Sequence, residues 1–334
     1  MIDFKQFNSL FDLVNYFNTE EICEQTIIES RWGIGEKQDV VCPYCRKHHC
    51  VKTSSRRFKC SHCNNKFSCR VGTIFDSSRL PLRKWFIAMY LLSCHKKGIS
   101  SVQLAHDIHV TQKTAWFMLH KIRTLFAQSD TPQLYGEVEL DEMYLGGREK
   151  NKHADKRTEG TQGRSTKTKA AIFGMAERQY DVNEDGELFV AGYNVKALMV
   201  ADTKATTLRP IIEQFIASGA HLYTDESKIY QSLAKWGYKH DFVNHSACEF
   251  SNMDGNTTNG IEGFWGLFKR VVFGTYHYVS KKHLQSYIDE AVYRWNTSKM
   301  KDEVRFAHMF NMSIGIVRQH EIREKEGNNL ACIA

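Results

Sequence analysis

The sequence EVELDEMYLGG at residues 137–147 decides how the rest of the chain is interpreted. Val138 and Leu140 alternate with acidic residues and a Gly-Gly pair follows, so the segment is predicted to be a β-strand that ends in a turn. Two interpretations are open from this segment alone: a half-exposed strand with a polar face, or a strand whose acidic residues take part in chemistry. The segments before and after it distinguish between the two.

The length and composition favour a globular protein of two or three domains. The chain has 334 residues, of which 42% are hydrophobic and 25% are charged. No apolar run approaches the ~20 residues that span a bilayer, and residues 1–17 lack a basic segment followed by an apolar core. We therefore expect a cytoplasmic protein with no membrane partner, whose ten cysteines are reduced or metal-bound.

Basic residues are concentrated in two segments of the chain. Residues 36–130 contain seventeen Lys and Arg against five Asp and Glu, and residues 148–169 contain eight against three. Residues 1–35, by contrast, contain two basic and six acidic residues. A solvated charged face is the alternative, but such segregation is typical of a protein that binds nucleic acid. We therefore expect association with DNA and with the nucleoid.

The first 35 residues are predicted to form a helical segment without chemistry. Apolar residues recur at steps of three and four from Phe4 to Phe17, which predicts one amphipathic helix. Asn18 or Thr19 can cap a second, short helix that runs through Ile28. Such apolar stripes are usually packing surfaces.

Two Cys-x-x-Cys pairs predict a metal site. Cys42 and Cys45 precede Cys60 and Cys63 by a spacing that lets four thiolates converge on one zinc in a zinc ribbon. The compartment disfavours a disulfide, and a redox motif would not need two pairs. Because cysteines fill all four positions, this zinc should stabilise the fold and not catalyse. Basic residues beside the second pair are candidate phosphate contacts: Arg56, Arg57 and Lys59.

Residues 100–126 have the pattern of a helix-turn-helix. A short capped helix at 100–108 is followed by a turn at 109–110 and by a longer helix whose N-cap is Thr111. An ordinary helical hairpin is the alternative, and the neighbouring basic ribbon favours DNA binding. The predicted DNA contacts on the second helix are Gln112, Lys113, Thr114, Lys121 and Arg123.

From residue 135 onward the pattern changes to that of an α/β domain. The predicted strands are at 137–147, 170–176, 187–195, 221–226 and 239–245. One predicted helix is capped by Thr206 or Thr207, and three others are at 227–236, 260–270 and 281–296. This order is that of an RNase H-like domain. It places Asp141 on the first strand, Asp225 at the end of the fourth, and Glu262 on a helix beside them.

Three carboxylates brought together cannot all remain ionised without cations. Two Mg²⁺ (or Mn²⁺) ions suit such an oxygen-only ligand set and would support phosphoryl transfer. Lys269 lies two turns beyond Glu262 on the same helix face, where it could contact a DNA phosphate. Glu139 shares the strand face of Asp141 and is the best alternative ligand. The other nearby acids are predicted to be bystanders: Glu137, Glu142 and Glu226.

These motifs together resemble those of DDE-type bacterial insertion-sequence transposases with an N-terminal zinc ribbon and helix-turn-helix. The resemblance rests on the two cysteine pairs and on residues 136–142, 223–227 and 258–270, and it covers roughly residues 36–300. It implies that Asp141, Asp225 and Glu262 form the metal-binding triad, with Lys269 in the accessory basic position. It also implies binding to terminal inverted repeats, Mg-dependent strand cleavage and transfer, and target DNA as a second partner.

The predicted fold class is multidomain α+β with a mixed five-stranded sheet in the catalytic domain. The predicted divisions are a helical segment (1–35), a zinc ribbon (36–76), a helix-turn-helix domain (77–130), an RNase H-like catalytic domain (135–300) and a C-terminal tail (301–334). Holding two DNA ends together suggests at least a homodimer. Two other functions are open: a DNA-binding regulator with an inactive catalytic domain, and a structure-selective RNase H-like nuclease.

Overall fold

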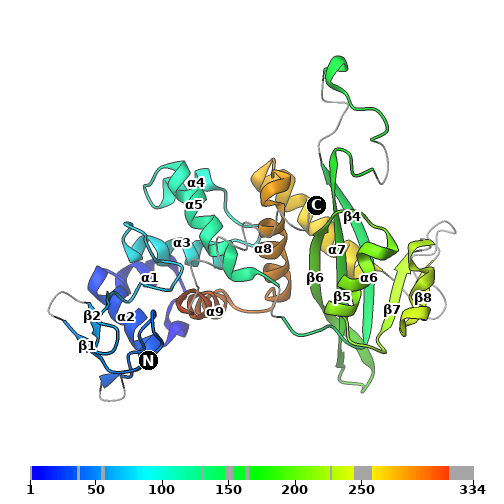
Figure 1. Ribbon diagram of the computed structural model, residues 1–334. Coiled ribbons are helices and arrows are strands. Elements are labelled where there is room, and N and C mark those ends of the chain that lie inside the picture. The colour runs from blue at the N-terminus through cyan, green and yellow to red at the C-terminus, as the bar shows by residue number, and fades with distance from the viewer. Residues whose placement is uncertain are drawn as a thin grey trace. The chain divides into compact units, whose positions relative to one another are not determined.

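The computed structural model describes residues 2–35, 38–53, 57–128, 131–146, 153–161, 165–225, 228–243 and 258–315 (Figure 1). Two compact units are present. The N-terminal unit combines the described residues up to Phe126 with residues 299–315, and the sheet unit contains the described residues of 127–298. Among the helices of these segments, none is long and apolar enough to cross a membrane.

The chain opens with a 3₁₀ turn at Phe4–Gln6 and the helix α1 (Leu10–Tyr16). The prediction of one continuous helix here is wrong, because Ser9 starts a new one. Its hydroxyl accepts the Asp12 N–H at 3.2 Å, and the Asp12 carboxylate accepts the Ser9 N–H at 2.9 Å. This reciprocal capping box ends the preceding turn. The next helix, α2 (Glu20–Trp32), is capped by Thr19.

Three short strands follow and form an antiparallel sheet in the order β1-β2-β3. They are β1 (Cys50–Lys52), β2 (Phe58–Cys60) and β3 (Lys66–Phe67). The rings of Phe58 and Phe67 stack with centroids 5.8 Å apart, and Trp32 at the end of α2 lies 5.1 Å from Phe58. Aromatic packing therefore holds the ribbon against α2.

Three helices of the N-terminal unit cover the region of the predicted helix-turn-helix pattern, and the last two match its predicted helices. They are α3 (Leu82–Cys94), α4 (Ser101–Asp107) and α5 (Gln112–Arg123). Ser100 caps α4, and Thr111 caps α5 by accepting the Thr114 N–H at 3.2 Å. Short polar residues at these positions satisfy amide groups that the helices leave without a partner.

A further helix, α9 (Asp302–Ile314), lies where the sequence predicts a C-terminal tail. Phe306 and Phe310 occupy one side of it and pack on the buried helix α3 through Tyr90 and Phe86. Arg305 donates to the Ser93 carbonyl at 2.7 Å. The three- and four-residue spacing of apolar residues in α9 buries them in the core of the N-terminal unit.

The sheet unit contains a mixed five-stranded sheet in the order β6-β5-β4-β7-β8, so the predicted fold class is confirmed. Strands β4, β5 and β6 are antiparallel neighbours, and β7 and β8 run parallel to β4. Their bounds are β4 (Glu137–Gly146), β5 (Lys169–Val182), β6 (Leu188–Val200), β7 (His221–Asp225) and β8 (Lys239–Val243). The strand predicted to lie at an edge, β8, does so.

Helices cover the two faces of this sheet. One core joins Val138 and Leu140 of β4 to α6 (Ala205–Phe215), and the other joins Met143 of β4 to α7 (Asn259–Val271) and α8 (Leu284–Asn296). Because side chains alternate along a strand, the odd-numbered residues of β4, including Asp141, face α7.

Two local predictions within the sheet unit are wrong. Neither Thr206 nor Thr207 caps α6, because Lys204 occupies the cap position and Thr207 instead donates to Asp202 at 2.6 Å. The segment predicted as a helix at 227–236 contains two short 3₁₀ helices, Lys228–Ser232 and Ala234–Trp236.

Candidate functional site

Asp141 and Asp225 lie on adjacent parallel strands and on the same face of the sheet. The register of β4 and β7 pairs Glu137 with His221 and Glu139 with Tyr223. Two residues farther along, the same register leads to Asp141 and Asp225, and a step of two preserves the face. The end of each strand therefore carries its aspartate toward the same region.

Glu262 approaches this region from the helix that covers the face. It lies in the first turn of α7 and is exposed, and the Thr258 hydroxyl donates to its carboxylate at 3.0 Å. A cavity of about 380 Å³ is lined on the strand side by Asp141 and on the helix side by Glu262 and Lys269. Asp225 is not among its lining residues. The remaining lining residues are Glu142, Met143, Tyr144, Trp265 and Gly266.

The electrostatics of Asp141 reflect its surroundings. Burial, and after it the negative charges of Glu142, Asp225 and Glu262, together raise the pKa of this carboxyl from the ordinary 3.8 to about 7. The backbone N–H of Glu142 donates to one carboxylate oxygen of Asp141 at 2.8 Å, and this hydrogen bond lowers the pKa of the carboxyl. The three acids thus repel one another across this region.

The second oxygen of Asp141 is held by a side chain that sequence patterns do not predict as functional. The indole N–H of Trp265 donates to it at 3.1 Å. Gly174, which pairs with Asp141 on β5, provides the space, because a Cβ atom there would lie 2.4 Å from the indole ring. Trp265 follows Glu262 by three residues, and that helical spacing is the one signal in the sequence that could have identified it.

The carboxyl set suits a hard divalent cation by the chemistry of its donors, since all of them are oxygens. Their present spacing is wider than a metal cluster needs. In the described part of the chain, the four ribbon cysteines are the one group of three or more potential ligands gathered within 4.8 Å. Mutual repulsion gives a physical reason why three carboxylates would approach more closely only around a cation.

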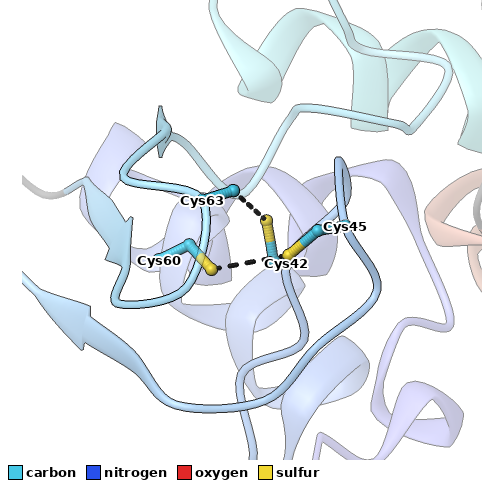
Figure 2. Close-up of side chains that lie close together, drawn as sticks. All are labelled: Cys42, Cys45, Cys60 and Cys63. Carbon is cyan, nitrogen blue, oxygen red and sulfur yellow. Dashed lines mark hydrogen bonds between the residues drawn. The ribbon is translucent and has the colours of Figure 1, made fainter.

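The four cysteines have the geometry of a structural zinc site (Figure 2). The Sγ atoms of Cys42 and Cys63 lie 3.6 Å apart, as do those of Cys45 and Cys60. Zn–S bonds of about 2.3 Å in a tetrahedron require sulfurs about 3.8 Å apart. Backbone N–H groups of Cys63 and His62 lower the pKa of the Cys60 thiol to about 6, whereas burial raises the pKa of the Cys42 thiol.

The predicted DNA contacts are divided between surface and interior. Gln112 and Lys113 are exposed at the start of α5, and Thr114 beside them is half-buried. Arg123 is only 1% exposed, and Lys121 is half-buried and donates to the Asp76 carbonyl at 2.8 Å. Burial of Arg123 and the bond of Lys121 to the Asp76 carbonyl therefore disagree with their prediction as DNA contacts. On the ribbon, Arg57 and Lys59 are exposed, and Arg56 lies outside the described residues.

Glu139, the alternative ligand proposed from the sequence, has other partners. Its side chain is fully buried, forms an ion pair with Arg178 at 3.0 Å, and accepts the N–H groups of Gly260 and Ile261. Strand periodicity places Glu139 on the face of Asp141 but does not show that the helix α7 begins next to it. Glu142 lies on the opposite strand face, where the hydroxyl of Tyr230 donates to it.

The raised pKa of Asp141 predicts how stability depends on pH. Without Mg²⁺, the folded protein holds this proton more tightly than the unfolded chain, so the stabilisation is lost as pH rises toward about 7. We expect this group to lower the free energy of unfolding by roughly 2 kcal/mol between about pH 5.5 and 7. Urea denaturation of zinc-loaded protein should show this slope, and Asp141→Asn should remove it. The same slope in both proteins would contradict the assignment.

Comparison with known proteins adds an independent finding. Residues 133–296 match the ISXO2-like transposase domain, and residues 18–66 match the transposase zinc-ribbon domain. The second match begins before the predicted ribbon, in accord with the packing of Trp32 on Phe58.

Two relatives extend this comparison to whole proteins. A protein in the transposable element ISH50 of Halobacterium salinarum is 28% identical over 287 residues, which cover 82% of this chain and 90% of the relative. A transposase-like protein of Haemophilus influenzae is 30% identical over 110 residues, which cover 33% of this chain and 87% of the relative.

Proposed function

The chain belongs to the transposases that carry an ISXO2-like domain and a zinc ribbon, and from this membership we propose that it moves a DNA element by cleaving its ends and joining them to target DNA. The observation that supports the catalytic step most directly is the position of Asp141. The register of β4 and β7 brings Asp141 level with Asp225, and Asp141 lines a cavity together with Glu262. The negative charges of Glu142, Asp225 and Glu262 act on its carboxyl group.

In this proposal Asp141, Asp225 and Glu262 hold two Mg²⁺ or Mn²⁺ ions. When bound, such ions activate an attacking oxygen and stabilise a leaving oxygen during an in-line phosphoryl transfer. Beside burial, the negative charges of Glu142, Asp225 and Glu262 raise the pKa of Asp141, and this repulsion supports the assignment because a divalent cation would relieve it.

Other residues of the chain orient these groups and the DNA. The indole N–H of Trp265 and the backbone N–H of Glu142 each bind one oxygen of Asp141, which restricts rotation of its carboxylate. Lys269 is exposed and lines the same cavity, where its ammonium group would pair with a phosphate of the DNA backbone. These contacts would align the scissile strand with the acids.

Recognition of the element ends would belong to the N-terminal unit. The first turn of α5 contains Gln112, Lys113 and Thr114, of which the first two are exposed. A recognition helix contacts base edges in the major groove from this position. Arg57 and Lys59 would contact phosphates from the ribbon, and Arg56 would join them. Two ends must be held together for joining, so we propose a homo-oligomer on DNA.

The experiment that tests this function compares three DNA substrates with purified protein and Mg²⁺. One carries the sequences that flank the coding region in its element, one is branched, and one is unrelated duplex. We expect nicking and strand joining on the first alone. Binding without metal-dependent cleavage would instead indicate a regulator, and cleavage of branched DNA without joining would indicate a structure-selective nuclease.

A further inference from the structure

We propose that Glu139 is a positioning residue that fixes the first turn of α7 on β4 and thereby sets the place of Glu262 relative to Asp141. This inference rests on the proposed function of those two acids as metal ligands. It assigns Glu139 no direct contact with metal or DNA.

The contacts of Glu139 join two elements that are far apart in the sequence. One carboxylate oxygen accepts the N–H of Gly260 at 2.8 Å and that of Ile261 at 3.1 Å, within the first turn of α7. The other oxygen accepts the Nε–H of Arg178 at 3.0 Å. The side chain is 0% exposed, so water does not replace these partners.

Glu139 takes the role that a cap residue normally has. The first N–H groups of a helix have no partner within it, and Thr258 at the cap position of α7 makes no side-chain bond to them. A carboxylate from the strand binds them instead, and its charge complements the positive end of the helix dipole. Burial of a carboxylate is unfavourable unless it is paired, and Arg178 supplies the opposite charge.

The glycine at the start of α7 allows this close contact. A Cβ atom at residue 260 would lie 2.2 Å from the ring of Tyr193 on β6. Without that atom, the helix start can lie against the tyrosine and bring its N–H groups within reach of Glu139. The placement of α7 on the sheet therefore depends on contacts at this end.

The positions of these contacts connect the proposed ligands. Glu139 precedes Asp141 by two residues on the same face of β4, and Ile261 directly precedes Glu262 on α7. A second bond between the same elements joins Trp265 to Asp141 at 3.1 Å. Two attachment points, one near each proposed ligand, restrict both sliding and rotation of the helix over the strand.

The carboxylate of Glu139 binds both Arg178 and the first turn of α7, and Gln at this position could bind only one of them. A carboxylate accepts hydrogen bonds at both oxygens, whereas an amide has one acceptor oxygen and one donor nitrogen. Glu139→Gln can therefore satisfy Arg178 or the helix, but not both. Glu139→Asp keeps the charge and is one methylene shorter, so it loses reach to one side.

The chain offers a matched control on the same strand. Glu137 also pairs with Arg178, at 2.9 Å, and accepts a hydrogen bond from Tyr180. The structure gives it no bond to α7 among the described residues. Glu137→Gln therefore removes an ion pair from the same arginine and leaves the helix start in place.

The test measures Mn²⁺ binding by calorimetry, without DNA, and amide hydrogen exchange at Gly260 and Ile261 in zinc-loaded full-length protein. We expect Glu139→Gln to weaken Mn²⁺ affinity by at least about 10-fold, as supporting residues of metal sites do, and to speed exchange of both amides. Glu137→Gln should stay within about 2-fold of wild type in both measurements. Glu139→Asp, which serves if Glu139→Gln does not fold, should show the same pattern more weakly.

Two outcomes separate this inference from the function on which it rests. If wild type binds Mn²⁺ and Glu139→Gln binds it equally well, the positioning role of Glu139 is wrong and the proposed ligands stand. If wild type binds no Mn²⁺ at this site, the proposed function of the acids is overturned. Equal losses in the Glu137 and Glu139 variants would assign the effect to Arg178 and would also overturn the inference.

Discussion

Asp225→Asn is expected to reduce DNA strand cleavage and joining by about 10²–10³-fold or more, while affinity for the element ends changes little. Asparagine has nearly the same shape as aspartate but carries no charge. Since Asp225 lies at the end of β7 beside Asp141, its loss would leave too little negative charge to hold the ions. The measurement is single-turnover cleavage of end-containing DNA with Mg²⁺, together with DNA binding by fluorescence anisotropy.

The matched control for this variant is Asp181→Asn. Asp181 is exposed near the end of β5, and its carboxylate accepts only a local bond from the Val182 N–H among the contacts described. We expect it to retain cleavage within about 2-fold, as surface substitutions usually leave the structure intact. Cleavage that persists in Asp225→Asn would refute the assigned role, and equal loss in both variants would indicate a general defect.

Cys60→Ser is expected to have the second large effect, a loss of zinc and of DNA binding. Structural zinc contributes on the order of 10–16 kcal/mol to folding in zinc-finger peptides, so loss of one thiolate should unfold the ribbon. The ribbon would then no longer present Arg57 and Lys59. We expect affinity for end DNA to fall at least about 10²-fold, a loss of several phosphate contacts. Zinc content and fluorescence anisotropy measure the two changes.

Cys50→Ser provides the control. Cys50 lies opposite Cys60 in the register of β1 and β2 and is not part of the four-cysteine cluster. It should keep both zinc and DNA affinity. Zinc loss in Cys50→Ser would contradict the ligand assignment. Normal DNA binding by zinc-free Cys60→Ser would show that the ribbon is not needed for recognition. Mn²⁺ binding should survive in Cys60→Ser, since the acids belong to the other unit.

Features that depend on neighbouring residues were predictable from the sequence. Thr111 was identified as the cap of the helix that begins at Gln112, because a cap bonds to an amide only three residues away. The four cysteines were identified by their spacing, since each pair forms one turn around a metal. Alternation along β4 placed Asp141 and Glu139 on one face for the same reason.

Features that depend on distant contacts were not predictable in this way. Arg123 has the positive charge expected of a DNA contact, but its side chain is buried inside the N-terminal unit. Residues 302–314 follow the predicted catalytic domain and are predicted to belong to a C-terminal tail. Their aromatic side chains nevertheless pack on α3. The spacing of apolar residues can predict that a helix is amphipathic, but it does not identify a packing partner that is distant in the sequence.

The sequence by itself predicted the four cysteines of the zinc site, the helices of the helix-turn-helix pattern and the order along the chain of the elements that carry the three acids, because spacing and periodicity express local geometry. The tertiary structure alone shows which acid is buried against a helix and which lines the cavity. Glu139 and Asp141 have the same side-chain chemistry and face, but only Glu139 lies beneath the first turn of α7 and beside Arg178. Burial and long-range partners set the role of a carboxylate, and both arise only when the strand and the helix meet.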